Sequence, residues 1–148
     1  MSNDTDLVKL YSGRILALAA DIPHLGRLDH PTASAKRRSP QCGSTVTVDL
    51  CVEDGRITAI GQDVRACALG QAAASVLGRG AIGSTRDEID AARDALASML
   101  KADGAPPVEP FAELETLLPA RAFPNRHASI LLAFEAAAEA LEQAERAA

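Results

Sequence analysis

The chain has 148 residues, of which 47% are hydrophobic, and its formal net charge is -5 at pH 7. This length and hydrophobic content fit a single domain that buries its own core. The negative balance argues against nucleic acid as the main partner, because a phosphate-binding surface concentrates Lys and Arg. The run Lys36-Arg37-Arg38 is a short basic cluster. No run of about 18 apolar residues occurs, so we expect no membrane span.

The N-terminus Met-Ser-Asn-Asp-Thr-Asp is acidic and lacks the basic start of a signal peptide. We therefore expect a cytoplasmic protein. In a reducing compartment, cysteines that converge in space are more often metal ligands or reactive thiols than a structural disulfide. We treat residues 1–148 as one domain and expect residues 1–6 and 143–148 to be frayed tails.

A helix is predicted over residues 4–21, with Asp4 or Thr5 as its cap and an apolar stripe that includes Ile15 and Leu18. Pro23 ends it. Residues 22–40 read as a connection rich in Pro, Gly and charged residues, and a short edge strand is expected near residues 34–38.

A β-hairpin is predicted over about residues 44–64, because Asp54-Gly55 between two extended runs is a strong turn signal. Residues at equal distances from this turn then face each other, so Glu53 opposes Arg56 and Cys42 opposes Cys67. Directly opposed residues lie about 4.5–5.5 Å apart at Cα. The hairpin therefore predicts two cysteines side by side at its open end, close enough for a shared metal ion or a disulfide.

The third cysteine, Cys51, is expected to be a bystander. It follows Cys42 by nine residues, which at about 3.3 Å per residue separates the two by roughly 30 Å. It also falls in the polar register of its strand, whereas Val46 and Val48 belong to the apolar register.

Three further helices are predicted after the hairpin, together with one short helical segment. A nearly all-apolar helix begins at Cys67 and ends at Gly78 or Gly80, and a second covers about residues 86–102 with Ser84 as its cap. A short helix over about 111–118 precedes a long one, capped by Asn125, that extends to about Ala144. The expected fold class is α+β: a small antiparallel sheet of about three strands packed against several helices.

Two of these helix starts carry metal-binding residue types. Cys67 falls in the first turn of its helix, where unpaired N–H groups and the helix dipole favour a thiolate. His127 falls in the first turn of the last helix, where the dipole favours neutral imidazole, the form that binds metals. The alternatives are buried free thiols for the cysteines and a bond to a backbone carbonyl, or exposure to solvent, for His127. Gln71 has two readings: a hydrogen bond near the thiols or one to the backbone.

The segments 40–44, 66–75 and 125–132 resemble the iron–sulfur cluster scaffold family, the type found in IscU, SufU and the N-terminal domain of NifU. The resemblance covers about residues 7–142. It implies that Cys42 and Cys67 match the first two cysteines of the family's metal or cluster site. His127 matches the histidine before the third cysteine. Ser44 stands where the family has Asp, and Ala128 stands where the family has the third cysteine.

The resemblance implies a non-enzymatic scaffold that binds iron, a two-iron (2Fe-2S) cluster or zinc through Cys42, Cys67 and His127. Its implied partners are a cysteine desulfurase and recipient iron–sulfur apoproteins, and it would act as a monomer or a homodimer. Two alternatives stay open. One is a zinc-bound sulfur acceptor like the SufU branch, and the other is a metal-free regulatory relative.

Overall fold

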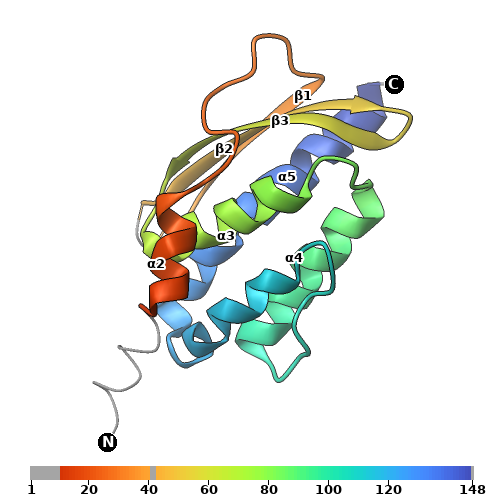
Figure 1. Cartoon of the computed structure of the whole chain (residues 1–148). Coiled ribbons are helices and arrows are strands. Elements are labelled where there is room, and N and C mark those ends of the chain that lie inside the picture. The colour runs from red at the N-terminus through yellow and green to blue at the C-terminus, as the bar shows by residue number, and fades with distance from the viewer. Residues whose placement is uncertain (1–10, 41–42, 148) are drawn as a thin grey trace, which may run out of the picture.

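The computed structural model describes residues 11–40 and 43–147 and has an α+β fold (Figure 1). In chain order its elements are α2 (Gly13–Ala20), β1 (Ala33–Arg38), β2 (Thr45–Glu53), β3 (Arg56–Arg65), α3 (Ala68–Gly80), α4 (Arg86–Lys101), the 3-10 helices η1 (Ala112–Ala122) and η2 (Pro124–Arg126), and α5 (His127–Ala147). The strands form one antiparallel sheet in the order β1-β2-β3. This confirms the predicted fold class.

The predicted two-residue turn joins β2 to β3. Asp54 and Gly55 both have positive φ, 53° and 77°, as a type I′ turn requires. Glu53 faces Arg56 across the turn, as the sequence predicted.

The register beyond the turn differs from the predicted one. A shift next to Cys51 leaves Thr58 without a partner, so that Cys51 pairs with Ala59 and Thr45 pairs with Arg65. Such a β-bulge adds one residue to one strand and increases the local twist. The prediction of an even register is therefore wrong by one residue from Cys51 to the open end of the hairpin.

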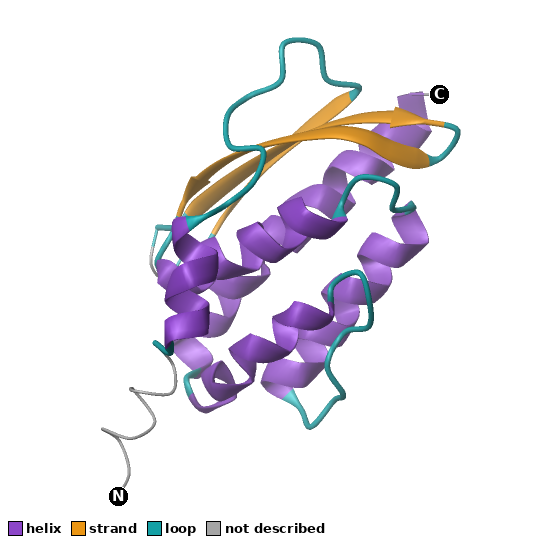
Figure 2. Cartoon of the chain, in the orientation of Figure 1, coloured by secondary structure: helices purple, strands orange, loops and turns teal. Residues whose placement is uncertain are grey.

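The two faces of the sheet are covered by different parts of the chain (Figure 2). Helix α5 packs against β1 and β2 on the face that presents Val46, Val48 and Leu50, all of them fully buried. On the other face, the loop between α2 and β1 crosses the middle of the sheet, where Leu28 N–H donates to Asp49. That crossing is close, because a Cβ on Gly61 would lie 2.5 Å from the Gly26 carbonyl oxygen.

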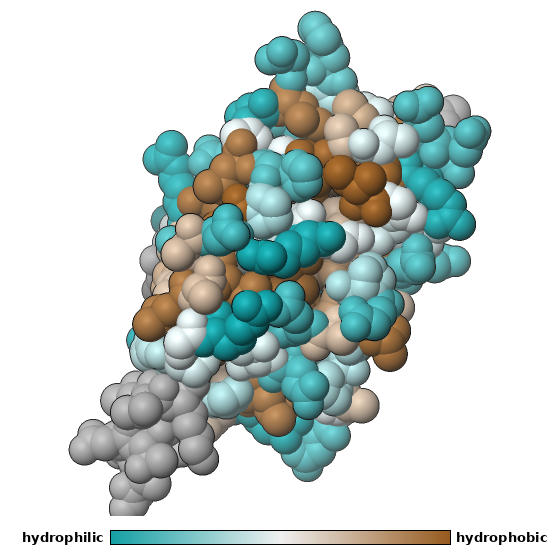
Figure 3. Space-filling view, in the orientation of Figure 1, coloured by the Kyte–Doolittle hydropathy of each residue, from teal (hydrophilic) through white to brown (hydrophobic). Residues whose placement is uncertain are grey.

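The core between the sheet and the helices is built from aliphatic side chains and alanine. Helix α3 is buried over most of its length, as its apolar sequence predicted, and it contacts both α2 and α5. On the side shown in Figure 3, hydrophobic residues reach the surface as small separate groups among hydrophilic ones. Within the described ranges, no helix combines the length and the apolar character needed to cross a membrane.

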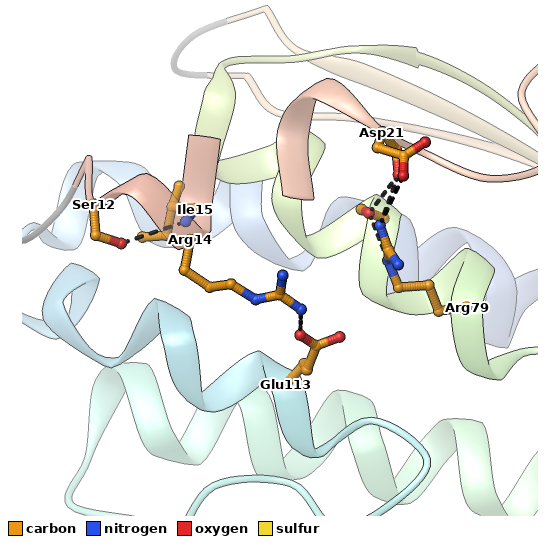
Figure 4. A network of polar contacts seen from close by, with 7 residues as sticks. Ser12, Arg14, Ile15, Asp21, Arg79 and Glu113 are labelled. Atoms are coloured by element: carbon orange, nitrogen blue, oxygen red, sulfur yellow. Dashed lines mark hydrogen bonds and ion pairs between the residues drawn. The ribbon is translucent and has the colours of Figure 1, made fainter. Parts of the chain in front are cut away.

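Polar contacts fix α2 against its neighbours (Figure 4). The Ser12 hydroxyl accepts a hydrogen bond from Ile15 N–H and caps the helix. Arg14 forms an ion pair with Glu113 of η1. At the other end, Arg79 of α3 donates to the Asp21 carbonyl oxygen over 3.0 Å. Both ends of α2 are therefore tied to other helices.

Several helix boundaries differ from the predicted ones. Helix α2 begins at Gly13 with Ser12 as its N-cap, so the predicted helix does not run unbroken through residues 11 and 12. The predicted cap at Asp4 or Thr5 lies outside the described residues. Thr85, not Ser84, caps α4, because its hydroxyl forms a reciprocal capping box with Glu88. Residues 112–122 form 3-10 turns that extend past the predicted end at 118.

The last helix also begins and ends at other residues than predicted. Asn125 lies inside η2 and does not cap α5. Helix α5 continues to Ala147, beyond the expected end at Ala144, so residues 143–147 are helical rather than a frayed tail.

Candidate thiol site

Cys67 lies where the hairpin meets α3. Strand β3 ends at Arg65 and α3 begins at Ala68, so Cys67 is the N-cap residue, with extended backbone dihedrals. Its side chain is half-buried and makes no capping hydrogen bond of its own. The sequence predicted this position at the start of a buried helix.

The surroundings of Cys67 favour the thiolate. Burial raises the pKa of the thiol, but several groups together lower it further. These are the backbone N–H groups of Gly70 and Leu69, the hydroxyl of Ser129 and the charge of Arg126. The net pKa lies below the ordinary value, which makes Cys67 a better metal ligand and nucleophile.

Two serine hydroxyls connect Cys67 to the start of β2. The Cys67 Sγ lies 3.6 Å from Ser129 Oγ, and Ser129 donates to Ser44 Oγ over 3.2 Å. Ser129 is in the first turn of α5, and both serines are buried. The chain of contacts therefore joins residues from α3, α5 and the start of β2.

Gly70 allows this approach of α5 to α3. A Cβ built on Gly70 would lie 3.0 Å from Ser129 Oγ and 2.8 Å from Ala66 Cβ. Any other residue at position 70 would push Ser129 away from Cys67 or distort the start of α3.

The segment that contains Cys42 is closed at its base by main-chain hydrogen bonds. Ser39 N–H donates to the Ser44 carbonyl, and Gly43 N–H donates to the Ser39 carbonyl. The Ser39 hydroxyl is buried and has no hydrogen-bond partner in the described part of the chain. Cys42 itself lies outside the described residues, so its predicted position opposite Cys67 stays a prediction.

His127 is buried at the start of α5, and its Nε2 lies 2.9 Å from the Ala120 carbonyl oxygen. This agrees with the alternative of a histidine bonded to the backbone. The side chain also lines an open cavity of about 540 Å³ together with residues of α4 and η1, among them Lys101 and Arg121. Its predicted role as a ligand stays a prediction.

The remaining candidate residues, Gln71 and Cys51, contact backbone carbonyl groups. Gln71 donates to the Ala66 carbonyl, which is the backbone alternative. Cys51 lies at the turn end of β2, with its Sγ 3.6 Å from the His30 carbonyl oxygen, which agrees with a bystander role. Within residues 11–40 and 43–147, no three His, Cys, Asp or Glu side chains form a group that could hold a metal ion.

Ser129 is the residue of this site that sequence reasoning missed. The signal was available, because Ser129 is a lone hydroxyl at the start of a long apolar stripe on the last helix. A buried hydroxyl there needs a polar partner. Helical spacing alone does not show that the partner is a cysteine from another helix.

The fold and the site define a small α+β domain that presents a half-buried thiol where a β-hairpin meets a helix. No family model matches the chain. A solved structure of the N-terminal part of a nitrogen-fixing NifU-like protein from Brucella abortus has 45% sequence identity and a TM-score of 0.94. That match covers 97% of this chain and 99% of the other. The chain belongs to the IscU/NifU-like family of iron–sulfur cluster scaffold proteins.

One curated relative agrees with this assignment, and a further solved structure shares the fold. The iron–sulfur cluster assembly scaffold protein IscU from Streptococcus pyogenes serotype M1 is 26% identical over 124 residues. These residues are 84% of this chain and 77% of the relative. A SUF-system protein, FiSufU, from Fervidobacterium islandicum AW-1 shares the fold, with a TM-score of 0.82 at 19% identity. That match covers 90% of this chain and 98% of the other.

Proposed function

We propose that this protein is an iron–sulfur cluster assembly scaffold whose cargo, iron or a two-iron cluster, is held by Cys42 and Cys67, with His127 as the third ligand. The observation that carries the proposal is the half-buried Cys67, whose pKa is lowered and which is linked through Ser129 to Ser44. Cys42 precedes Ser44 by two residues, so its Cα lies within about 7.6 Å of the Ser44 Cα. This short spacing in the chain supports Cys42 as the second thiol of the proposed site.

The tautomer of His127 supports its role as a ligand. A carbonyl oxygen only accepts, so Nε2 carries the proton and donates to Ala120. The lone pair is then on Nδ1. Histidines that bind metals commonly donate their other ring N–H to a backbone carbonyl or carboxylate in this way.

Two thiolates and one imidazole supply three ligands, whereas a two-iron cluster takes four. A fourth position would be filled by Ser44, by water or by a partner's residue. The replacement of the family's Asp and third cysteine by Ser44 and Ala128 leaves a weaker ligand set. Such a set suits cargo that is held briefly and passed to a recipient apoprotein.

The lowered pKa of Cys67 also favours a second candidate function, a zinc-bound sulfur acceptor. The Cys67 thiolate would attack the outer sulfur of a persulfide on a cysteine desulfurase. A new S–S bond forms at Cys67, the bond between the donor's two sulfurs breaks, and the donor cysteine leaves as a thiolate. Zinc would be held by the same three residues, with Zn–S distances near 2.3 Å.

Both candidates imply a cytoplasmic protein, as a monomer or a homodimer, that works with a desulfurase and catalyses no reaction on a small-molecule substrate. They differ in the metal that is bound. A metal-free regulatory relative is the third outcome that the following experiment distinguishes.

Anaerobic reconstitution of the purified protein with ferrous iron and sulfide tests the proposal. We expect a visible cluster chromophore in the wild type that falls to background in Cys42→Ser and in Cys67→Ser. Cys51→Ser is the matched control and should keep the chromophore, because Cys51 lies at the other end of the hairpin.

Metal analysis of freshly purified protein separates the alternatives. Stoichiometric zinc without a chromophore would replace the first function by the second. A folded protein that binds neither metal would overturn both.

A further inference from the structure

One end of the outer sheet face carries a cluster of cations. Arg38, Thr45 and Arg65 pair across the three strands and therefore share one face. Lys36 lies two residues before Arg38 and also belongs to this face. We call Lys36, Arg38 and Arg65 the basic face.

The basic face is largely without internal partners. Lys36 and Arg38 are exposed and form no ion pair within the described ranges. Arg65 is 79% exposed in its side chain and lies 3.7 Å from Asp63. The chain as a whole has a formal net charge of -5, so this local cluster of positive charge is opposite in sign to the net charge of the protein.

Arg37 shows the contrast within the same strand. It points to the opposite face, where its guanidinium lies 3.0 Å from Glu139 of α5. Its charge is used to hold the strand against the helix. Lys36 and Arg38, one residue to each side, form no comparable ion pair with another described residue.

The three side chains of the basic face are exposed to solvent among the described residues. The loop between α2 and β1 covers the middle of the outer face, where Arg27 binds Asp49 and Gly26 approaches Gly61. Among the described residues, the exposed large hydrophobic side chains are Leu16, Leu25, Ile82 and Val108, and none of these lies in a strand. A partner would therefore recognise this surface through its charge rather than through apolar contacts.

The basic face also borders the thiol site. Arg38 immediately precedes Ser39 at the base of the segment that carries Cys42, and Arg65 is two residues before Cys67. A protein that docks on this face is therefore held next to Cys67.

We propose that the basic face is the docking surface for an acidic surface of the cysteine desulfurase that delivers sulfur to Cys67. The inference rests on the proposed function, because it assigns a partner to that site. A half-buried thiolate needs a donor that approaches in a fixed orientation, and cations beside it attract and align an acidic partner.

A different role for the same charges must be distinguished. Strand β1 is an edge strand, and lysines on an edge protect it against pairing with other chains. This role predicts self-association on charge removal and no change in desulfurase binding.

The test compares three single charge reversals, Lys36→Glu, Arg38→Glu and Arg146→Glu, and the double variant Lys36→Glu/Arg38→Glu. Each single reversal changes the net charge equally, and Arg146 lies at the far end of α5, about 25 Å along the helix axis from Ser129. Binding to the purified desulfurase of the same organism is measured by calorimetry at low and at high salt. We expect about 2–5-fold weaker binding for Lys36→Glu and for Arg38→Glu, and about tenfold weaker binding for the double variant. Arg146→Glu should bind the desulfurase as tightly as the wild type.

High salt should reduce all of these differences, since exposed charges are screened. Equal binding by the double variant and the wild type at low salt overturns the proposal, as does weakening that Arg146→Glu shares. Self-association of the double variant with unchanged desulfurase binding assigns the charges to edge protection instead.

Reconstitution with iron and sulfide alone, without the desulfurase, separates this inference from the proposed function. The charge-reversed variants should gain the same chromophore as the wild type. If the wild type fails to form the chromophore in that assay, the proposed function is overturned. If reconstitution is normal and the charge-reversed variants still bind the desulfurase as the wild type does, only the docking role of the basic face is overturned.

Discussion

At the scale of single residues, the reactivity of Cys67 comes from its neighbours and not from exposure. The thiol is half-buried, which opposes ionisation, yet N–H groups at the start of α3 and the Ser129 hydroxyl stabilise the charged form. The Ser129 hydroxyl lies beside the Cys67 sulfur only because Gly70 lets α5 approach α3 closely. One hydroxyl from a distant part of the sequence thus tunes the thiol.

We predict that Ser129→Ala moves the midpoint of the pH–rate curve for alkylation of Cys67 to higher pH, because a group that lowers the thiol pKa is lost. The measurement uses iodoacetamide and metal-free protein that carries Cys42→Ser and Cys51→Ser, so that Cys67 is the sole thiol. Ser84→Ala removes another buried hydroxyl, which donates to Gly80, and serves as the control. Identical curves for the two variants would show that Ser129 does not act on Cys67.

At the scale of elements, the sheet keeps a buried charge on the face opposite α5. Asp49 is fully buried and accepts hydrogen bonds from Arg27 Nε (2.7 Å), Leu28 N–H (3.0 Å) and Ser34 Oγ (2.5 Å). Burial raises the pKa of this carboxyl, but the bonds from Arg27, Ser34 and Leu28 lower it further, so the net pKa is below the ordinary value. Asp49 thereby fixes the loop across β2.

We predict that Asp49→Asn lowers the free energy of unfolding at pH 7 by about 2–3 kcal/mol, because hydrogen bonds to a buried charge are lost. The folded protein favours the carboxylate, so Asp49 contributes this stability above the unfolded pKa. The contribution is lost as the pH falls through the lower folded pKa. Urea unfolding from neutral to acidic pH should therefore show a smaller gap between variant and wild type at the acidic end.

Asp63→Asn is the control for this prediction, because Asp63 lies on the same face of the sheet but is partly exposed. It should change stability by less than about 1 kcal/mol. A gap for Asp49→Asn that does not depend on pH would contradict the assignment.

At the scale of the whole molecule, the core and the candidate metal site are separate. The core extends continuously between sheet and helices, and Phe111 of the loop before η1 packs edge-to-face on Phe134 of α5 with ring centroids 5.2 Å apart. Cys67 lies at the end of β3, at the start of α3 and in contact with Ser129 near the start of α5. The fold is therefore held by burial of apolar surface rather than by a metal.

We predict that treatment with a chelator leaves the protein folded, with a cooperative urea transition, because no core contact depends on the metal. The midpoint should fall only by the binding free energy of the metal that is removed. Phe134→Ala is the comparison and should lower the free energy of unfolding by about 3–5 kcal/mol through the cavity it leaves. Unfolding by the chelator alone, as occurs in domains that fold around zinc, would contradict this account.

The sequence by itself determined the fold class, the Asp54-Gly55 turn and the position of Cys67 at the start of a buried helix. Each of these depends on local signals: a turn that needs positive φ, an alternation of two residues along a strand, and an apolar run bounded by glycines. The resemblance to the scaffold family rested on short segments around the same residues, and the solved relative with 45% identity confirmed it.

Only the tertiary structure decided the bulge next to Cys51, the bond from His127 to Ala120 and the contact of Ser129 with Cys67. These features depend on how closely separate elements pack, and packing is set by side-chain volumes across the core rather than by neighbours in the chain. For the same reason, the register of the open end of the hairpin followed from the bulge and not from the turn.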